Sequence, residues 1–457
     1  MNIVVLSGGT AANALLPAFE AVSNELSFIL PISDNGGSTS EILRVLGGPA
    51  IGDIRSRIVH LIKDEKLRSL LGYRLSTETT GAKQEWNSIV EGTHAIWDGL
   101  ASEVKDICRS FLIHTQAEIL KKHKSSAPFQ FEKASVGNLF LTGVRLFLGS
   151  LDASIELALR VCRCDERTSI IPCINTNHTH HISALLQNGD VITGQSQISH
   201  PSRQQVKKNG GCDQLQMMKT QNMSTESLVG PDSSVLLKSQ YPSDEPFEEF
   251  EDNEEYAYPG YIHPELKLSQ LHFDKLDIEV DHLLPAAIKR IFYINPYGEE
   301  VLPQGNNRAV TKLKNSDMVV YSVGSLMTSL LPIIILGNIA ETMLENEHAR
   351  KVLLVNNKYD RETFGMDGAQ FVQLIAESMN RALNNQKRRR KGHKSESAGA
   401  VAPLPWTNFV TDLVYLKYGE IPVDVKSLEQ LGIRTFAIDS DTFQVDSLVT
   451  TLQSLQP

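Results

Sequence analysis

The chain has 457 residues, of which 41% are hydrophobic and 21% charged, and its formal net charge at pH 7 is −10. This composition is typical of a globular protein, and the negative charge argues against general nucleic-acid binding. The five cysteines are odd in number and include no C-x-x-C pair, which favours reduced thiols over disulfides or a zinc site. No basic secretory leader precedes the first apolar run, and the longest apolar run, near residues 330–339, is too short to cross a bilayer. We therefore expect a soluble, cytoplasmic protein without a membrane partner.

The N-terminal segment predicts repeated units of strand, glycine turn and helix. Residues 3–6 are an all-apolar run typical of a buried parallel strand, and residues 11–23 have the pattern of a helix. A second apolar run, residues 28–32, also ends in a glycine turn. The turn residues are Gly8, Gly9 and Thr10 after the first run, and Asp34, Asn35, Gly36, Gly37 and Ser38 after the second, followed by Gly52, Asp53, Ile54 and Arg55.

These turns predict a site for a phosphate or a nucleotide. Glycine turns at the carboxyl ends of neighbouring parallel strands direct backbone N–H groups and helix N-termini into one crevice, where open α/β sheets bind anionic ligands. Glycine lets a phosphate approach the bare backbone. Asp34 and Asp53 would add hard oxygen ligands to the same crevice, suited to Mg²⁺ that bridges phosphates.

The following residues predict a mainly helical segment. Apolar residues recur at helical spacing in patches from Ile54 to about Lys122, and we expect Trp86 and Trp97 to pack in the core. A long amphipathic run covers residues 137–163. Asn138, at its start, either caps the helix or contacts a ligand, and local arguments leave the two alternatives open.

A β-hairpin is predicted after the helical segment. Residues 170–174 predict a strand, and residues 182–186 and 191–193 flank an Asn-Gly turn typical of a hairpin. His178, His180 and His181 precede the hairpin, but no acidic or cysteine partner has zinc-site spacing. We interpret these histidines as an exposed loop that leads into a strand.

Two segments differ in composition from the rest. Residues 202–269 are rich in Lys, Gln, Ser, Asp and Glu, with an acidic run at residues 245–255. We expect a low-complexity insertion within one domain, available to protein partners. Residues 385–404 predict a flexible basic loop whose cluster at residues 387–391 is either a solvated surface, the favoured interpretation, or a nuclear localisation signal.

The α/β pattern resumes beyond the insertion. Residues 288–294 and 317–323 predict strands, and the second of these precedes Gly324 and Ser325, a third glycine turn, and a helix over residues 330–346. Strands at residues 351–355, 409–416 and 434–438 and a helix at residues 368–384 complete the pattern. The fold class is therefore α/β: one domain over residues 1–457 with a Rossmann-like, mostly parallel sheet, helices on both faces and a β-hairpin element.

The glycine motifs resemble those of the CofD/YvcK family, also described as UPF0052. The resemblance covers roughly residues 1–200 and 281–385, and the acidic insertion and basic loop indicate a eukaryotic branch, with a fungal branch as the narrower expectation. The motifs that carry it are Ser-Gly-Gly-Thr at residues 7–10, Asp-Asn-Gly-Gly-Ser at 34–38, Gly-Asp-Ile-Arg at 52–55, Gly-Asn-Leu at 137–139, Ile-Pro at 171–172, Asp-Val-Ile-Thr-Gly at 190–194 and the segment 324–332.

The resemblance implies a nucleotide in the crevice and two alternative functions. One branch transfers a 2-phospholactyl group from a guanosine-diphosphate carrier to a deazaflavin alcohol, with Mg²⁺. The other branch, the gluconeogenesis or morphogenesis factors, binds UDP-sugars and regulates carbon metabolism or cell shape. By the resemblance, Asp34 and Asp53 match the metal-holding carboxylates. Gly8, Gly9 and Thr10 match the phosphate loop, Asn138 a ligand-facing amide, and Gly324 and Ser325 the later glycine turn.

Three motifs depart from the family pattern. Ala11 replaces a glycine, and it would be strained if its backbone needs a positive φ. Asn35 replaces a second aspartate, and Ser322 and Val323 replace Gly-Pro before Gly324.

We favour a Mg²⁺-dependent transferase in which Arg55 offsets charge on the leaving phosphate, with a nucleotide-sugar sensor as the alternative. A dinucleotide dehydrogenase is disfavoured because the first turn lacks G-x-G-x-x-G. The sequence leaves open whether the nucleotide is GDP- or UDP-linked, and whether the protein is a homodimer.

Overall fold

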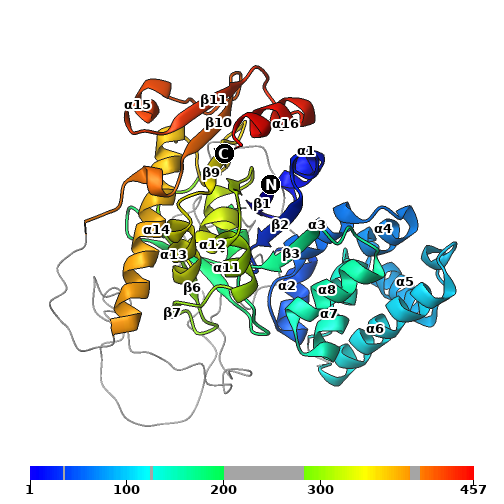
Figure 1. The fold of residues 1–457 in the computed structure, drawn as a ribbon. Helices are drawn as coiled ribbons and strands as arrows, with labels where there is room; N and C mark the ends of the chain where they lie inside the picture. Colours follow the sequence, from blue (N-terminus) through cyan, green and yellow to red (C-terminus); the bar gives the residue numbers. More distant parts are fainter. Residues whose placement is uncertain (34–35, 124–126, 200–282, 392–401, 457) are drawn as a thin grey trace, which may run out of the picture.

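The computed structural model describes residues 1–33, 36–123, 127–199, 283–391 and 402–456 (Figure 1). The predicted acidic insertion at residues 202–269 and the predicted site residues Asp34 and Asn35 lie outside the described residues.

A seven-stranded parallel sheet forms the centre of the fold, as predicted. Its strands are short apolar runs that are mostly buried, which is the pattern of a parallel sheet covered by helices. The strand order is β11-β10-β9-β8-β1-β2-β3. The strands are β1 (Asn2–Leu6), β2 (Glu25–Leu30), β3 (Thr168–Pro172), β8 (Met318–Tyr321), β9 (Arg350–Leu354), β10 (Asp412–Leu416) and β11 (Arg434–Ile438).

The order of the strands reverses at β1. The chain first adds β2 and β3 on one side of β1, then returns to place β8 on its other side and continues outward to β11. Val5 of β1 is therefore paired with Phe28 of β2 and with Val320 of β8. Such a reversal opens a crevice at the carboxyl ends of the two diverging strands, so the fold favours ligand binding between β1 and β8.

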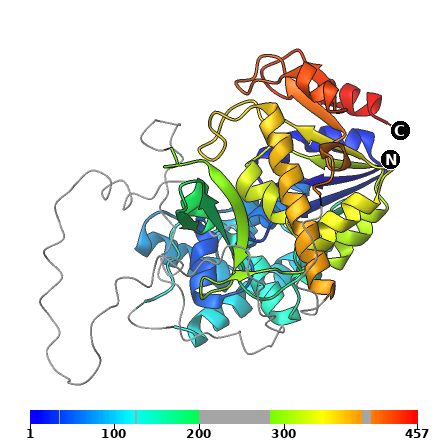
Figure 2. The same ribbon diagram turned by 90° about the vertical axis from the view of Figure 1, so that its left-hand side faces the viewer.

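A second, antiparallel sheet of four strands lies beside the first (Figure 2). The predicted hairpin forms one side of this sheet, with Gly189 in the turn at a φ of 91°. Its strand order is β5-β4-β6-β7, with β4 (His181–Leu186), β5 (Val191–Thr193), β6 (Ile288–Ile294) and β7 (Glu300–Val301). Because β4 pairs with β6, the chain on either side of residues 200–282 belongs to one sheet.

Helices cover the parallel sheet, and five of them form a lobe at the lower right of Figure 1. Trp86 and Ile89 are fully buried and Trp97 nearly so, which confirms their predicted place in the core. The lobe helices are α4 (Glu65–Gly72), α5 (Thr79–Glu91), α6 (Ser102–Lys121), α7 (Val136–Leu148) and α8 (Leu151–Val161). The other helices of eight or more residues are α2 (Ser38–Leu46), α3 (Gly52–Leu61), α11 (Asn307–Lys314), α13 (Gly337–Glu345), α14 (Gly368–Lys391) and α16 (Val445–Ser454).

Two predicted helices are broken. The run over residues 137–163 divides into α7 and α8, because Gly149 takes a φ of 68° and the Ser150 side chain caps the next helix. The helix predicted over residues 330–346 is instead η6 (Leu326–Leu330), α12 (Leu331–Ile334) and α13, with a bend of 76° before α13. Pro332 lies in the first turn of α12, where it fits the boundary between η6 and α12.

The predicted loop over residues 385–404 begins as helix. Helix α14 extends to Lys391, so residues 385–391 lie in its last two turns. Arg390 there forms a bidentate ion pair with Glu341, with nitrogen–oxygen distances of 2.6 and 2.7 Å. Part of the basic cluster is therefore used within the fold.

No single helix in the described part of the chain is long and apolar enough to span a membrane. One bent pair, Leu326–Ile334 with Gly337–Glu345, has the length and composition for a span, but most of its apolar side chains are buried within the fold.

Candidate functional site

The first glycine turn packs its backbone directly against the start of α3. A Cβ atom added to Gly9 would lie 2.3 Å from Cα of Asp53, and one added to Gly8 would lie 2.7 Å from Oγ of Ser329. Any side chain would therefore displace backbone at Gly9. The Cβ position on Gly8 is also 3.7 Å from Oδ2 of Asp53. The predicted residues Gly8, Gly9 and Asp53 are thus brought together.

A buried arginine that sequence reasoning missed holds this turn from behind. The Arg57 guanidinium donates hydrogen bonds to Oγ of Ser7 at 3.2 Å, to the carbonyl of Gly8 at 3.3 Å and to the carbonyl of Ala12 at 3.4 Å. Burial lowers the pKa of Arg57 to about 10, with Asp53 acting in the opposite direction, so the group stays charged at neutral pH. Its spacing of four residues from Asp53 on α3 was the sequence signal that places both on one helix face.

The second glycine turn leads into α2 and is tied to Arg55 through Asn138. Gly37 has a φ of 56°, and Ser38 is the first residue of α2. The Asn138 amide donates to Oγ of Ser38 at 2.9 Å, and its carbonyl oxygen accepts from Nε of Arg55 at 3.3 Å. Burial and, to a smaller extent, the charge of Arg74 lower the pKa of Arg55 to about 10, with Asp53 acting in the opposite direction.

These contacts exclude one of the two alternatives for Asn138. Ser135, rather than Asn138, caps α7, so the capping interpretation is wrong. The side chain is 1% exposed and connects α2, α3 and α7. It positions Arg55 and the second turn relative to each other.

The third glycine turn lies beside the first. A Cβ added to Gly324 would lie 3.7 Å from Cβ of Ala11, and the φ of Gly324 is 138°, which few other residues adopt. The Asn356 side chain pairs with both the N–H and the carbonyl of Gly324, at 3.0 and 2.7 Å. Ala11 opens a helical turn, η1 (Ala11–Leu15), and is not among the described residues with a positive φ, so the expected strain does not arise.

Ser325 is engaged by a buried carboxyl group. Its hydroxyl donates to Glu362 and accepts from the Thr328 N–H at 2.9 Å. Ser199 also donates to Glu362, and Oγ1 of Thr328 lies 3.2 Å from the carboxyl. Burial and then the nearby Asp360 raise the pKa of Glu362 to about 7. Sequence reasoning did not single out Glu362. Its partners Ser325 and Ser199 lie 37 and 163 positions away in the sequence, and no local spacing records contacts over such distances.

Two buried hydroxyl groups at the strand ends lack a hydrogen-bond partner among the described residues. They belong to Ser33, shortly after β2, and to Ser322, directly after β8, and each residue is 1% exposed. Buried polar groups are usually paired, so unpaired ones beside a crevice favour a ligand or a water there.

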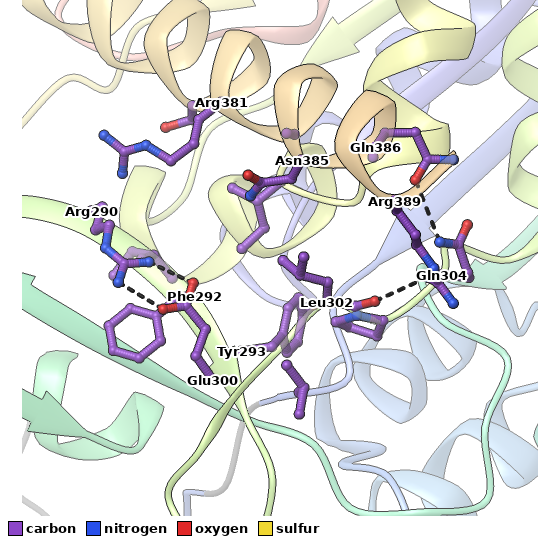
Figure 3. A pocket seen from close by; sticks show the side chains of 17 residues that line it. Arg290, Phe292, Tyr293, Glu300, Leu302, Gln304, Arg381, Asn385, Gln386 and Arg389 are labelled. Atoms are coloured by element: carbon purple, nitrogen blue, oxygen red, sulfur yellow. Dashed lines mark hydrogen bonds and ion pairs between the residues drawn. The ribbon is translucent and has the colours of Figure 1, made fainter. Parts of the chain in front are cut away.

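Two hollows lie beside α14. The larger, about 390 Å³, is lined by Met327, Arg361, Glu362 and Phe364 together with residues of β6 and α14. The other lies between α14 and the β6–β7 hairpin, where Arg290 pairs with Glu300 (Figure 3). None of the three glycine turns lines this second hollow.

The described residues include no group of three or more His, Cys, Asp or Glu side chains arranged to hold a metal ion. His181 lies in β4 and not in the preceding loop, and burial lowers its pKa to about 4. Of the two carboxylates predicted to hold Mg²⁺, Asp53 is described, at the first turn, and Asp34 lies outside the described residues.

Comparison with known proteins gives one consistent family. The model of the family described as "2-phospho-L-lactate transferase CofD" matches residues 3–434. A Saccharomyces cerevisiae protein, "Uncharacterized protein YNL011C", is 56% identical over 460 residues, which is 100% of this chain and 99% of that protein. A Thermotoga maritima protein named "Putative gluconeogenesis factor" is 26% identical over 177 residues, 37% of this chain and 56% of its own length.

Solved structures give the same fold. Protein BH3568 from Bacillus halodurans, described as a member of the UPF0052 family, has a TM-score of 0.57 and 16% sequence identity. The alignment covers 99% of this chain and, in one of its two structures, 99% of the other. The predicted α/β fold is thereby confirmed.

We predict that Gly9→Ala disrupts the first turn. The added methyl group cannot fit against the Asp53 backbone, so the turn or α3 must move, and we expect a loss of at least 2 kcal/mol in the free energy of unfolding. Urea denaturation measures it. Gly72→Ala in α4 is the matched control, because its Cβ would meet the nearest atom at an ordinary 3.6 Å. Equal stability of the two variants contradicts the close contact.

We predict that Arg57→Met destabilises the fold by about 2–4 kcal/mol, because it leaves buried acceptors at Ser7, Gly8 and Ala12 without their donor. Arg160→Met, which removes an exposed ion pair with Glu156, is the control and should change stability by less than about 0.5 kcal/mol. A near-neutral effect of Arg57→Met in thermal or urea unfolding would show that the turn does not depend on this arginine.

Proposed function

The chain belongs to the CofD family, and we propose that it binds a nucleotide-linked phosphate ester between β1 and β8 and transfers a phosphorus-containing group from it with the help of Mg²⁺. The observation that carries this proposal is the convergence of two glycine turns from distant parts of the chain at the reversal of strand order, with Asp53 at the start of α3 beside the first of them.

The turns are suited to an anion. Backbone N–H groups at glycine turns and at helix starts point free hydrogen-bond donors and partial positive charge at the space between them. Gly8, Gly9 and Thr10 open the first helical unit, and Gly324 and Ser325 open the third, where the Gly324 N–H itself is bonded to Asn356. A diphosphate carries two adjacent anionic groups, which matches two turns side by side.

The chemistry of the predicted metal ligands fits Mg²⁺. This ion is commonly held by one or two carboxylates together with substrate phosphates and water. Asp53 would supply one carboxylate beside the first turn, and Asp34, which the sequence places just before the second turn, would supply the other. Bound there, Mg²⁺ would neutralise charge on the diphosphate.

The protein's own part in the transfer is positioning and electrostatics. The Asn138 amide fixes Arg55 relative to the second turn, where its cationic charge would offset charge that builds on the leaving phosphate. The Arg57 guanidinium fixes the first turn, and Asn356 the third. Held donors of this kind lower a barrier because they do not reorganise during the reaction.

A second candidate function is the sensing of a nucleotide-sugar without catalysis. It is supported by the relatives named "Putative gluconeogenesis factor", and by Asn35, which removes one negative charge at a position where the family often has a second aspartate. The same crevice would serve both functions, and the dependence on Mg²⁺ separates them.

We predict that GDP stabilises the protein against thermal unfolding only when Mg²⁺ is present, by about 2.7 kcal/mol at a hundredfold excess over Kd. Asp53→Asn should abolish this stabilisation while the unliganded protein melts at nearly the same temperature. The control is Glu103→Gln, which changes an acidic residue in the first turn of α6, far from the crevice in the helical lobe.

Thermal-shift measurements with GDP, UDP-glucose and NAD, each with and without Mg²⁺, distinguish the alternatives. Stabilisation by UDP-glucose that does not depend on Mg²⁺ favours sensing. Absence of stabilisation by every nucleotide contradicts both functions.

A further inference from the structure

We propose that Glu362 takes up a proton when an anion binds at the third glycine turn, so that ligand affinity in the crevice depends on pH. The proposal rests on the proposed function for the presence of an anionic ligand, and it concerns how the site itself responds to that ligand.

Two segments far apart in the sequence, α9 (Gln195–Ser199) and the start of η6, meet the loop of Glu362 at its carboxyl group. Ser325 precedes η6, Thr328 lies within η6 and Ser199 ends α9. Hydroxyls of Ser199 and Ser325 donate to the two different oxygens of Glu362, and Thr328 contacts the oxygen shared with Ser199. The residue is 6% exposed, so water does little to stabilise a negative charge there.

This cluster borders the proposed anion site. Gly324, directly before Ser325, lies beside Ala11 at the first turn, and Ser329, directly after Thr328, fills the space next to Gly8. Ser325 is therefore both a residue of the third turn and a hydrogen-bond donor to Glu362. A charge on Glu362 would repel an anion in the crevice.

The protonation state of Glu362 decides where the Ser325 hydroxyl hydrogen points. An ionised carboxyl group only accepts hydrogen bonds, so the Ser325 hydrogen is committed to it. A neutral carboxyl group has a hydrogen of its own to donate to a hydroxyl oxygen. The Ser325 hydrogen is then free to bond a phosphate oxygen. One proton passes from solvent to the carboxylate, its negative charge is lost, and only hydrogen bonds change.

The surroundings of Glu362 support titration near neutral pH. Burial and Asp360 both raise its pKa, while the three hydroxyls lower it, and the result is about 7. The charged groups nearest to it among the described residues are Asp360 and Arg361 of its own loop, while Lys289 of β6 and Glu377 of α14 line the same hollow as Glu362. The groups that contact it from α9 and η6 are hydroxyls, which do not titrate in this range. Arg361 donates to the carbonyl of Gln197 at 2.9 Å.

Glu362→Gln tests the proposal, because the amide is neutral, similar in shape and able to donate. We expect the variant to bind GDP with Mg²⁺ about tenfold more tightly than the wild type at pH 8, and equally tightly at pH 6. The comparison at each pH cancels the titration of the nucleotide phosphates. Isothermal titration calorimetry in HEPES and in Tris at pH 8 should show uptake of close to one proton per GDP by the wild type and less by the variant.

Glu300→Gln is the control, since Glu300 pairs with Arg290 in the hollow that no glycine turn lines. It should leave the pH dependence of the wild type unchanged. Equal affinities of wild type and Glu362→Gln at both pH values, with GDP bound, overturn the proton linkage and leave the proposed function standing. Failure of GDP and of inorganic pyrophosphate to bind either protein overturns both proposals.

Thermal unfolding without ligand tests the titration of Glu362 independently. Its folded pKa of about 7 lies above its ordinary value of 4.5, so it contributes stability that is complete below about pH 4.5 and is lost as pH rises through 7. The melting temperature of the wild type relative to Glu362→Gln should therefore fall between pH 5 and pH 8. A constant difference over this range contradicts a carboxyl group that titrates near neutral pH and overturns the proton linkage.

Discussion

The backbone contact between Gly9 and Asp53 is the constraint on which the rest of the site depends. With 2.3 Å between a Cβ position on Gly9 and Cα of Asp53, the chain must be bare at this point for β1 and α3 to meet. That contact brings Asp53, at the start of α3, to the end of β1. A single glycine therefore fixes both the anion-binding turn and the carboxylate next to it. The loss of backbone entropy that glycine costs is accepted where close approach is needed.

Three polar side chains then hold the turns from outside the space that a ligand would occupy. Arg57 binds the carbonyl side of the first turn, Asn138 connects Arg55 with the start of α2, and Asn356 pairs with Gly324. Each is largely buried or bonded through both ends, which limits its motion. The turns' N–H groups are therefore positioned before any ligand arrives, the condition under which fixed dipoles stabilise developing charge.

The sequence predicted the sheet well, because a buried parallel strand is a short apolar run that can be recognised from its own residues. β6 and β11 have the predicted bounds, and the strand–glycine–helix order places the turns at one edge. Helix breaks were harder: Pro332 and Gly149 were visible, but whether a chain bends at such residues depends on packing. Glu362 and Arg57 were missed as site residues because their partners come from β1, α9 and η6, and no spacing in one segment records a contact between distant segments.

The central proposal is that the crevice between β1 and β8 binds a diphosphate. A crystal structure of the full chain with GDP and Mg²⁺ tests it most directly. The account predicts the diphosphate between residues 8–10 and residues 324–325, with Asp53 on the metal side. A nucleotide bound instead in the hollow between α14 and the β6–β7 hairpin, with the glycine turns unliganded, would contradict it.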